Sequence, residues 1–225
     1  LQVRARHLQR RQDVHVDATQ NVIGVLPGTK PGPTFLLDAH TDTVFPAGTD
    51  VRVRREDGKL KAPGVGDDTT NLACGLFLLQ LVRDCGLSIP GTLMFSGTAG
   101  EEGLGDLCGI KAVMHELAGR VDYVLALDGQ LGRICNQGVG SHRHKITVKA
   151  QGGHSWADFG APSAIHALGA TIAKISKLDV PKNPRTTFNA GIICSGASVN
   201  TIAESAEMLR DLRLVSAEEL TSLEN

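Results

Sequence analysis

The chain has 225 residues, of which 41% are hydrophobic, and a formal net charge of -1 at pH 7. This length allows one large domain or two small ones, and the hydrophobic content is sufficient for a folded core. A nearly neutral chain, with a pI of about 6.8, has no basic field that would attract nucleic acid. Because no apolar run reaches the length of a membrane-spanning helix, we expect a globular protein that binds neither nucleic acid nor membrane.

The five cysteines are scattered, and none forms a CxxC pair. An odd number of isolated cysteines is typical of free thiols in a reducing compartment, and it argues against a disulfide framework or a cysteine-built zinc site. We therefore expect a cytoplasmic protein. Residues 1–13 carry four arginines without the apolar core of a signal peptide, so we interpret them as the solvated tail of a helix.

The first half of the chain alternates between predicted strands and predicted helices. In order we expect a hairpin of 15–17 and 21–26, a buried strand at 34–37, a hairpin of 51–54 and 59–61, a helix at 71–82, a strand at 91–97, a helix at 108–117 and a strand at 123–127. The helix at 71–82 is apolar nearly all round, which predicts packing between two layers. The alternation indicates an α/β fold with a mixed sheet and flanking helices.

The pattern changes near Gly138. A half-exposed strand at 144–150 precedes a helix at 162–178 with Pro162 in its first turn, two strands at 187–193 and 206–214, and a second helix from 218. This order predicts a small α+β domain of the ferredoxin-like type. We therefore place a first domain at 1–138 and an inserted domain at 139–225. The chain begins without methionine and ends two turns into the last helix, so we treat it as a truncated segment.

Acidic residues or a histidine follow the predicted strands of the first domain. They are His40 and Asp42 after the strand at 34–37, Asp67 and Asp68 after the second hairpin, Glu101 and Glu102 after the strand at 91–97, and Asp128 after the strand at 123–127. In α/β sheets such residues gather in the crevice beyond the carboxyl ends of the strands. Gathered carboxylates raise one another's pKa, and a divalent cation removes that penalty.

The ligand types at these positions indicate which metal they would hold. Nitrogen and oxygen ligands without thiolate suit zinc, with manganese or cobalt as alternatives. A carboxylate two residues from His40, at Asp42, can fix the proton on one ring nitrogen and leave the other free to bind metal. Two cations bridged by one carboxylate form a pair that is used in hydrolysis.

Five short motifs resemble the signature set of one dizinc family, which contains peptidase T, aminoacylase and the glutamate carboxypeptidases. They are His40-Thr-Asp42-Thr-Val, Gly66-Asp67-Asp68, Gly100-Glu101-Glu102-Gly-Leu-Gly, Leu127-Asp128-Gly and Gly152-Gly-His154-Ser. The motifs occur in the family's order, and the resemblance covers almost the whole chain.

The resemblance implies a role for each residue of the first domain. His40 and Asp128 would hold one metal, Glu102 would hold the other, and Asp67 would bridge them. Asp42 would orient His40. Glu101 would be the general base that takes a proton from the attacking water and returns it to the leaving amine. The peptide bond that follows Asp67 would be cis, as it often is in the family.

The same resemblance implies that the inserted domain is a lid through which the protein forms a homodimer. His154 would hydrogen-bond the developing oxyanion, within its own subunit or across the dimer; the alternative is an ordinary turn histidine. Asn200 matches a position that contacts substrate. Arg213 is either a substrate contact or a salt-bridged strand residue.

Two features depart from the family. Thr69-Thr70-Asn71 follows the acid pair where many relatives have lysine or a small residue and then glycine, although Thr69 or Thr70 can cap the next helix. The family's last metal ligand is a histidine beyond the lid, and no histidine of this chain fits that role. The second metal would therefore keep only Asp67 and Glu102, and we expect weak binding there and poor catalysis.

The sequence thus predicts a dizinc metallohydrolase that cleaves an amide or peptide bond of a small peptide or an N-acyl amino acid. Aspartate at position 128 favours aminopeptidase-type members such as peptidase T. The alternative is a catalytically dead or truncated relative that binds a metal or another ligand. Nucleotide binding at 103–109 is disfavoured because the glycine spacing is wrong, and no GxSxG elbow indicates a serine hydrolase.

Overall fold

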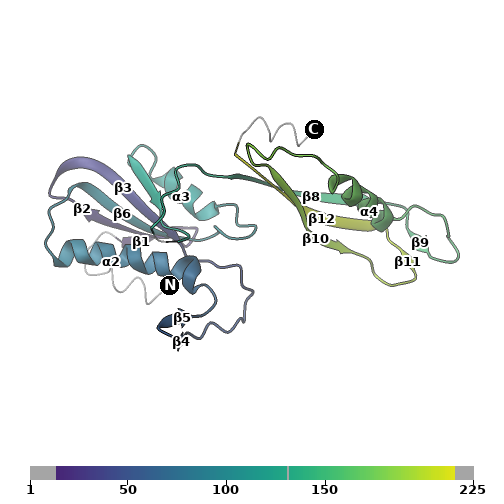
Figure 1. The fold of residues 1–225 in the computed structure, drawn as a ribbon, viewed down its shortest axis with the longest axis horizontal. Coiled ribbons are helices and arrows are strands. Elements are labelled where there is room, and N and C mark those ends of the chain that lie inside the picture. Colours follow the sequence, from purple (N-terminus) through teal and green to yellow (C-terminus); the bar gives the residue numbers. More distant parts are fainter. Residues whose placement is uncertain (1–13, 131, 216–225) are drawn as a thin grey trace. The chain divides into compact units, whose positions relative to one another are not determined.

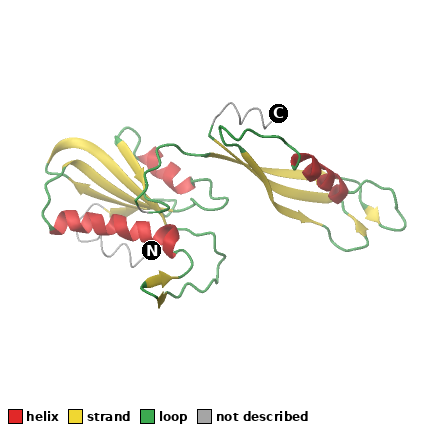
Figure 2. Ribbon diagram, in the orientation of Figure 1, coloured by secondary structure: helices red, strands yellow, loops and turns green. Residues whose placement is uncertain are grey.

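The computed structural model describes residues 14–130 and 132–215. The chain divides into two compact units, Leu1–Arg133 and Ile134–Asn225, and each is described by itself. The expected boundary after residue 138 lies a few residues further along the chain. Figure 1 and Figure 2 show a sheet with helices in the first unit and a smaller sheet with one helix in the second.

The first unit is built on a five-stranded mixed sheet in the order β1-β2-β6-β3-β7. β1 pairs antiparallel with β2 and β2 with β6, whereas β3 lies parallel to both β6 and β7. The strands confirm the first predicted hairpin and the predicted strands at 34–37, 91–97 and 123–127, with bounds that differ by a few residues. Their bounds are Val14–Val16 (β1), Val22–Pro27 (β2), Lys30–His40 (β3), Pro90–Thr98 (β6) and Tyr123–Ala126 (β7).

Two hydrophobic clusters cover the two faces of this sheet, because neighbouring residues of a strand point to opposite sides. Leu36 packs in the cluster that includes Val113 of α3 (Cys108–Glu116). Leu37 packs in the cluster that includes Leu72 of α2 (Thr70–Asp84). One helix therefore lies on each face, as the predicted alternation of strands and helices requires (Figure 1).

The prediction that the helix at 71–82 is buried between layers is wrong for the described part of the chain. α2 packs against β3 and β6 through one side only. Its other side exposes Phe77 by 62% and Leu78 and Leu81 by 42% each. The error has a physical reason. Apolar side chains favour contact with other apolar groups, but the sequence of this segment does not show whether a second layer is present to cover them.

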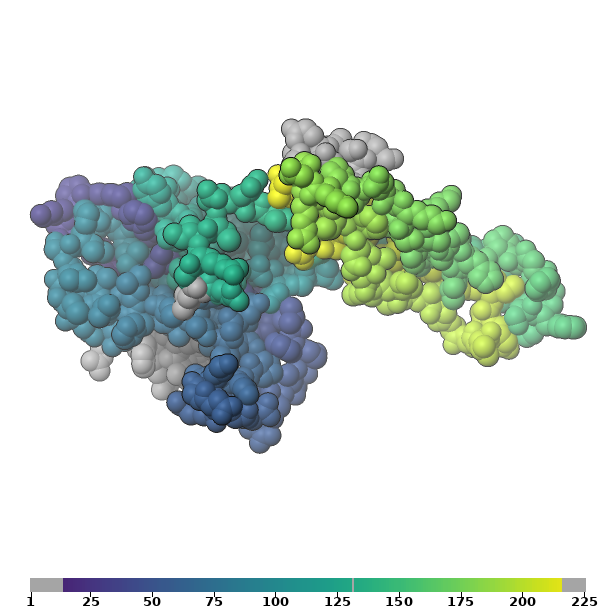
Figure 3. Space-filling model, viewed as in Figure 1, coloured from purple at the N-terminus to yellow at the C-terminus, as the bar shows by residue number. Residues whose placement is uncertain are grey.

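A short ribbon leaves the body of the first unit before α2 begins. It consists of β4 (Arg54–Glu56) and β5 (Lys59–Lys61), which pair antiparallel, and it stands out in Figure 1 and in the space-filling view of Figure 3. The predicted hairpin is confirmed, although its first strand begins at residue 54 and not at 51. A turn at Val65–Thr69, whose backbone is not helical at Asp67 and Asp68, then leads into α2.

The second unit contains a three-stranded antiparallel sheet in the order β10-β12-β8, with α4 packed on one face, and a small ribbon of β9 and β11. The predicted order of strand, helix, strand and strand is confirmed. The bounds are Gly140–Lys149 (β8), Gly153–His154 (β9), Ala164–Ile175 (α4), Thr187–Ser195 (β10), Thr201–Ile202 (β11) and Ser205–Leu214 (β12).

The start of α4 differs from the prediction. Pro162 precedes the helix, and Ser163 is the N-cap, whose hydroxyl oxygen accepts a hydrogen bond from the backbone N–H of His166 at 3.4 Å. A serine satisfies a free N–H at this position, so it sets the first turn more strongly than the proline does. The helix that we expect from residue 218 lies outside the described residues.

All five cysteines carry free thiols, and each is exposed. Among the helices in the described ranges, none combines the length and the apolar character that crossing a membrane requires. The first finding agrees with the prediction that the chain has no disulfide framework.

The packing of β3 generates a test of the first unit's core. Leu36 is fully buried, whereas Leu78 is 42% exposed. We expect Leu36→Ala to lower the free energy of unfolding by about 2–5 kcal/mol, because it leaves a cavity. The matched Leu78→Ala should change it by about 0.5 kcal/mol or less. Urea unfolding followed by circular dichroism measures both, and equal losses would contradict this description of the core.

Candidate metal centre

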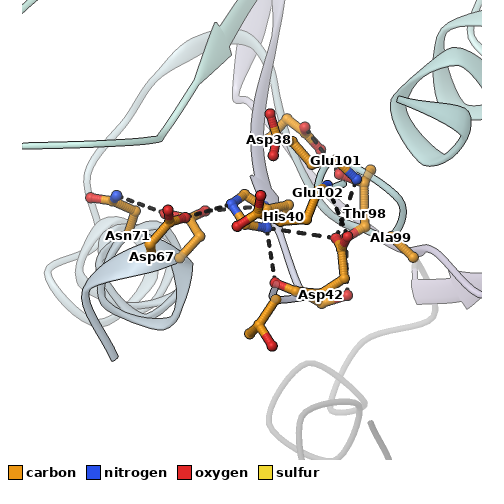
Figure 4. Close-up of polar contacts among 12 residues, drawn as sticks. Asp38, His40, Asp42, Asp67, Asn71, Thr98, Ala99, Glu101 and Glu102 are labelled. Carbon is orange, nitrogen blue, oxygen red and sulfur yellow. Dashed lines mark hydrogen bonds and ion pairs between the residues drawn. The ribbon is translucent and has the colours of Figure 1, made fainter. Parts of the chain in front are cut away.

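Three parallel strands bring His40, Glu101, Glu102 and Asp128 to one edge of the sheet. His40 is the last residue of β3 and lies opposite Thr98, the last residue of β6, while β7 runs parallel on the other side of β3. Glu101 and Glu102 follow β6, and Asp128 follows β7. Figure 4 shows His40 with Asp42, Asp67, Glu101 and Glu102 around it.

Two sets of candidate ligands share His40. In the first, His40, Asp67, Asp68 and Asp128 each offer one ligand atom, and these atoms lie within 4.8 Å of one another. In the second, His40, Glu101 and Glu102 do the same. The structure therefore brings together all five residues that we predict as metal ligands or general base, and it adds Asp68.

The hydrogen bonds of His40 decide which ring nitrogen can bind metal. The ring is 4% exposed. Its Nδ1 lies 3.1 Å from the backbone carbonyl oxygen of Asp42, and its Nε2 lies 2.9 Å from Oδ1 of Asp67. A carbonyl oxygen only accepts, so Nδ1 carries the proton. In the neutral ring Nε2 then keeps a lone pair that faces a carboxylate oxygen, an arrangement that requires a proton or a cation between them.

The pKa of His40 reflects this environment. Burial disfavours the charged ring, but the hydrogen bond to Asp67 and the charges of Asp68 and Glu101 outweigh it and raise the pKa. In the chain without a cation, a proton on Nε2 thus takes the place that a metal would take. The chemistry of the ligands fits zinc, which binds imidazole nitrogen and carboxylate oxygen.

Asp42 holds the turn that carries the two glutamates. Its carboxylate accepts hydrogen bonds from the backbone N–H groups of Glu101, at 3.3 Å, and Glu102, at 3.0 Å. Burial tends to raise the pKa of Asp42, but these two bonds outweigh it and lower the pKa, so the side chain stays ionised. The sequence predicts that this carboxylate orients His40. In the structure the backbone carbonyl of Asp42 makes the closer contact with the ring, and the carboxylate lies 3.6 Å away.

The two glutamates lie among like charges. Burial raises the pKa of Glu101, and the charges of Asp128, Asp42 and Asp67 raise it further. Burial and the charges of Asp67 and Glu101 also raise the pKa of Glu102. Carboxylates that repel one another in this way are the groups that a divalent cation would stabilise.

Asp68 and Asn71 are residues of this region that the sequence did not single out as site residues. Asp68 is 1% exposed, and its two oxygens accept hydrogen bonds from the backbone N–H of His40, at 3.0 Å, and the side-chain amide of Asn71, at 2.7 Å. Both oxygens are thus engaged by the protein. The Asp67–Asp68 peptide bond is cis, as the resemblance implies. The only sequence signal for Asp68 was its position next to Asp67.

A second buried acid lies two residues before His40 on the same strand. Asp38 is 8% exposed and accepts hydrogen bonds from the hydroxyl groups of Ser96 and Thr98. Burial raises its pKa despite these bonds. Sequence reasoning missed Asp38, because a single acid inside an apolar strand gives no sign that two hydroxyl groups of the neighbouring strand face it.

His154 and Asn200 lie close together in the second unit. Thr201 pairs with His154 between β11 and β9, and the backbone N–H of Ser155 donates to the carbonyl oxygen of Asn200 at 3.0 Å. The Nδ1 atom of His154 accepts from the backbone N–H groups of the residues two and three positions later, at 3.3 Å each. In the neutral ring Nε2 therefore carries the proton and can donate it to a hydrogen bond.

Arg213 forms an ion pair within its own strand. Its Nε donates to Oδ2 of Asp211 at 2.9 Å, and Arg143 also donates to the carboxylate of Asp211. Of the two interpretations of Arg213, this contact supports the salt-bridged strand residue.

Comparisons with known proteins show the family to which the chain belongs. The family model for peptidase family M20/M25/M40 matches residues 36–213. A crystal structure of aminopeptidase PepT from Bacillus cereus is similar with a TM-score of 0.66 and 26% identity, over 93% of this chain and 59% of that chain. A tripeptidase from Staphylococcus aureus has a TM-score of 0.72 and 22% identity, over 98% of this chain and 61% of that chain.

A third structure, the YXEP protein of Bacillus subtilis, is described as a dinuclear metal-binding peptidase. It has a TM-score of 0.62 and 17% identity, over 99% of this chain and 60% of that chain. No curated protein sequence matches the chain. The chain belongs to peptidase family M20/M25/M40, and the predicted relationship to the family of peptidase T is confirmed. It spans between 59% and 61% of the length of these three solved relatives.

The raised pKa values predict how stability depends on pH when no metal is bound. The ionised forms of Glu101 and Glu102 cost stability as the pH rises from 4.5 through their raised pKa values. The raised pKa of His40 contributes stability that is fully present below 6.5 and is lost as the pH rises through its value in the folded chain. All three shifts act in the same direction, so the metal-free chain should lose stability as the pH rises above 4.5, with the contribution of His40 lost above 6.5.

A bound cation should reverse this trend, because it competes with protons for the same atoms. We expect zinc to raise the melting temperature more at about pH 7.5 than at about pH 5.5, relative to the chain in EDTA. Thermal unfolding at both pH values with and without zinc measures this difference. An equal increase at both values would contradict a site built from His40 and these carboxylates.

Proposed function

We propose that this chain provides the metal centre and the lid of a hydrolase that cleaves an amide or peptide bond of a small peptide or an N-acyl amino acid. The observation that carries the proposal is the convergence of His40, Asp67, Glu101, Glu102 and Asp128 at one edge of the sheet. Membership of the peptidase family supports it. The names of the aminopeptidase and the tripeptidase favour small peptides as substrates.

We propose zinc as the metal, with manganese or cobalt as alternatives, and two ions as in the Bacillus subtilis relative. His40 and Asp128 would hold one ion, Glu102 the other, and Asp67 both. Bound there, the cations would polarise the scissile carbonyl and lower the pKa of water toward neutrality. The residues available in the described chain fit the first ion better, because the second set has only Glu101 and Glu102 besides the shared His40.

In the proposed reaction, Glu101 is the general base. It accepts a proton from the attacking water and passes it to the leaving amine. The bonds from the Glu101 and Glu102 N–H groups to Asp42 keep the two glutamates in fixed positions, so that one serves as base and the other as ligand.

The second unit would act as a lid and join two chains in a homodimer. His154 would donate from Nε2 to the oxyanion that forms at the scissile carbonyl, and its Nδ1 contacts support that tautomer. Asn200, which lies beside His154, would contact substrate. We place Arg213 in the ion pair with Asp211 and not at the substrate. The free cysteines support a cytoplasmic location.

A non-catalytic role is the second candidate function. The observation that favours it is that His40 is the only histidine of either candidate ligand set in the described part of the chain. A relative with one weak ion site would bind a metal or another ligand without turnover. Metal content by elemental analysis, measured together with hydrolysis of a panel of tripeptides, dipeptides and N-acyl amino acids, separates the two functions.

The division of roles between the two glutamates can be tested directly. Glu101→Gln should reduce hydrolysis by about 10²–10⁴-fold, because it removes the base. It should leave the metal content unchanged. The matched control Glu102→Gln should lower the metal content, because it removes a ligand. Loss of metal with Glu101→Gln and not with Glu102→Gln would show that the two roles are exchanged.

The role of His154 is tested by His154→Ala, with His166→Ala as the control histidine of the same unit. We expect His154→Ala to lower kcat by about 10²–10³-fold, because one donor to the oxyanion is lost. KM and metal content should change little. His166 is exposed in the first turn of α4, so its substitution should have no effect. An unchanged kcat for His154→Ala would exclude it from the reaction.

A further inference from the structure

Asn71 has an environment that helix formation does not explain. It lies in the first turn of α2 and is only 2% exposed. Asparagine forms helices less readily than alanine or leucine, and a buried amide is unfavourable unless its hydrogen bonds are made. Its side-chain amide reaches Asp68, three residues earlier in the turn that leads into the helix, and the loop at Gly129, 58 residues away. Asn71 also occupies one of the positions where the sequence departs from the family.

The two N–H groups of the Asn71 amide connect these loops. The nitrogen Nδ2 lies 2.7 Å from Oδ1 of Asp68 and 3.2 Å from the carbonyl oxygen of Gly129. Asp68 follows Asp67, and Gly129 follows Asp128, so each contact is one residue from a proposed ligand. A single planar group thus determines how far apart two ligand-bearing loops lie.

The connection continues to the third ligand through Asp68. The second oxygen of its carboxylate accepts from the backbone N–H of His40 at 3.0 Å. Asn71 and Asp68 therefore form one chain of hydrogen bonds, buried around Asp68 and partly buried at Gly129, that reaches the loops of His40, Asp67 and Asp128. Buried networks of this kind restrict their members to one arrangement when every donor is satisfied.

The second candidate ligand set has a separate support. Glu101 and Glu102 are held by the carboxylate of Asp42, and none of the hydrogen bonds of Asn71 reaches them. Asp42 thus holds the turn of the two glutamates, and Asn71 holds the loops of Asp67 and Asp128. Because Asp67 is proposed to bind both ions, a change at Asn71 should weaken the ion held by His40, Asp67 and Asp128 more than the ion held by Glu102.

We propose that Asn71 is a positioning residue that sets the spacing of the Asp67 and Asp128 loops, and so determines the affinity for the cation held by His40, Asp67 and Asp128. This inference rests on the proposed metal centre. Groups that orient metal ligands from behind typically contribute 10–100-fold to metal affinity. Asn71 touches no substrate or metal itself, and it acts through the loops that it joins.

The test is isothermal titration of the EDTA-treated chain with zinc, repeated for a set of variants. Asp128→Asn and Glu102→Gln identify the two binding events, since each removes a ligand of only one proposed ion. Asn71→Leu keeps the number and branching of the side-chain heavy atoms and removes both hydrogen bonds. Asn71→Asp keeps the shape and replaces the donor by an acceptor, so it serves if Asn71→Leu does not fold. Gln80→Leu, an exposed amide on the same helix, is the matched control.

We expect both Asn71 variants to weaken the event that Asp128→Asn removes by about 10–100-fold. The event that Glu102→Gln removes should lose less affinity, because Asp67 is its only ligand on a loop that Asn71 holds, and Gln80→Leu should leave both events unchanged. Circular dichroism in EDTA checks that each variant is folded. A purely structural role would not separate the two binding events in this way.

Three results would overturn the inference while leaving the metal centre in place. They are wild-type affinity for both ions in the Asn71 variants, an equal loss of both ions, and a single binding event in the unsubstituted chain that is insensitive to Asp128→Asn. A chain that binds no zinc before any substitution would instead overturn the proposed function itself, together with the inference that rests on it.

Discussion

The structure of the site depends on the parallel pairing of β3 with β6 on one side and with β7 on the other. Parallel strands end at the same edge of a sheet, so the residues that follow them meet although more than 20 residues separate them in the sequence. His40, Glu101 and Asp128 come together for this reason. An antiparallel partner at either place would have sent one of them to the opposite edge.

Bringing these acids together has an electrostatic cost, and the fold limits that cost in two ways. Asp42 is stabilised in its ionised form by two backbone N–H groups, and Asp68 accepts hydrogen bonds from Asn71 and from the backbone of His40, although burial still raises its pKa. Burial and neighbouring carboxylates raise the pKa values of Glu101 and Glu102, although the charge of His40 acts in the opposite direction. The carboxylates with raised pKa values are the ones that a divalent cation would stabilise.

Much of this could be predicted from the sequence, because strands and helices of strong pattern and short acidic motifs are local features. The strands that end at His40 and before Asp128, the helix at 108–116 and the α+β character of the second unit are confirmed. The prediction that the helix at 71–82 is buried on most sides was wrong, as the exposed Phe77 shows, because burial depends on what lies beside a helix. The contacts of Asp42 and Asn71 were missed for the same reason, since their partners lie 58 to 60 positions away.

The sequence by itself determined which chemistry the chain carries: the identity of the acids and the histidine, their order, and their positions just after strands. Only the tertiary structure decided how these groups serve one another. The contact of His40 with a backbone carbonyl places the proton of its ring on Nδ1. The carboxylate of Asp42 accepts hydrogen bonds from the turn that carries the two glutamates. The tertiary structure also linked the loops of Asp68 and Gly129 through one amide. Hydrogen bonds between distant segments depend on distances of a few tenths of an ångström, which the packing of the sheet and its helices sets and which no local pattern records.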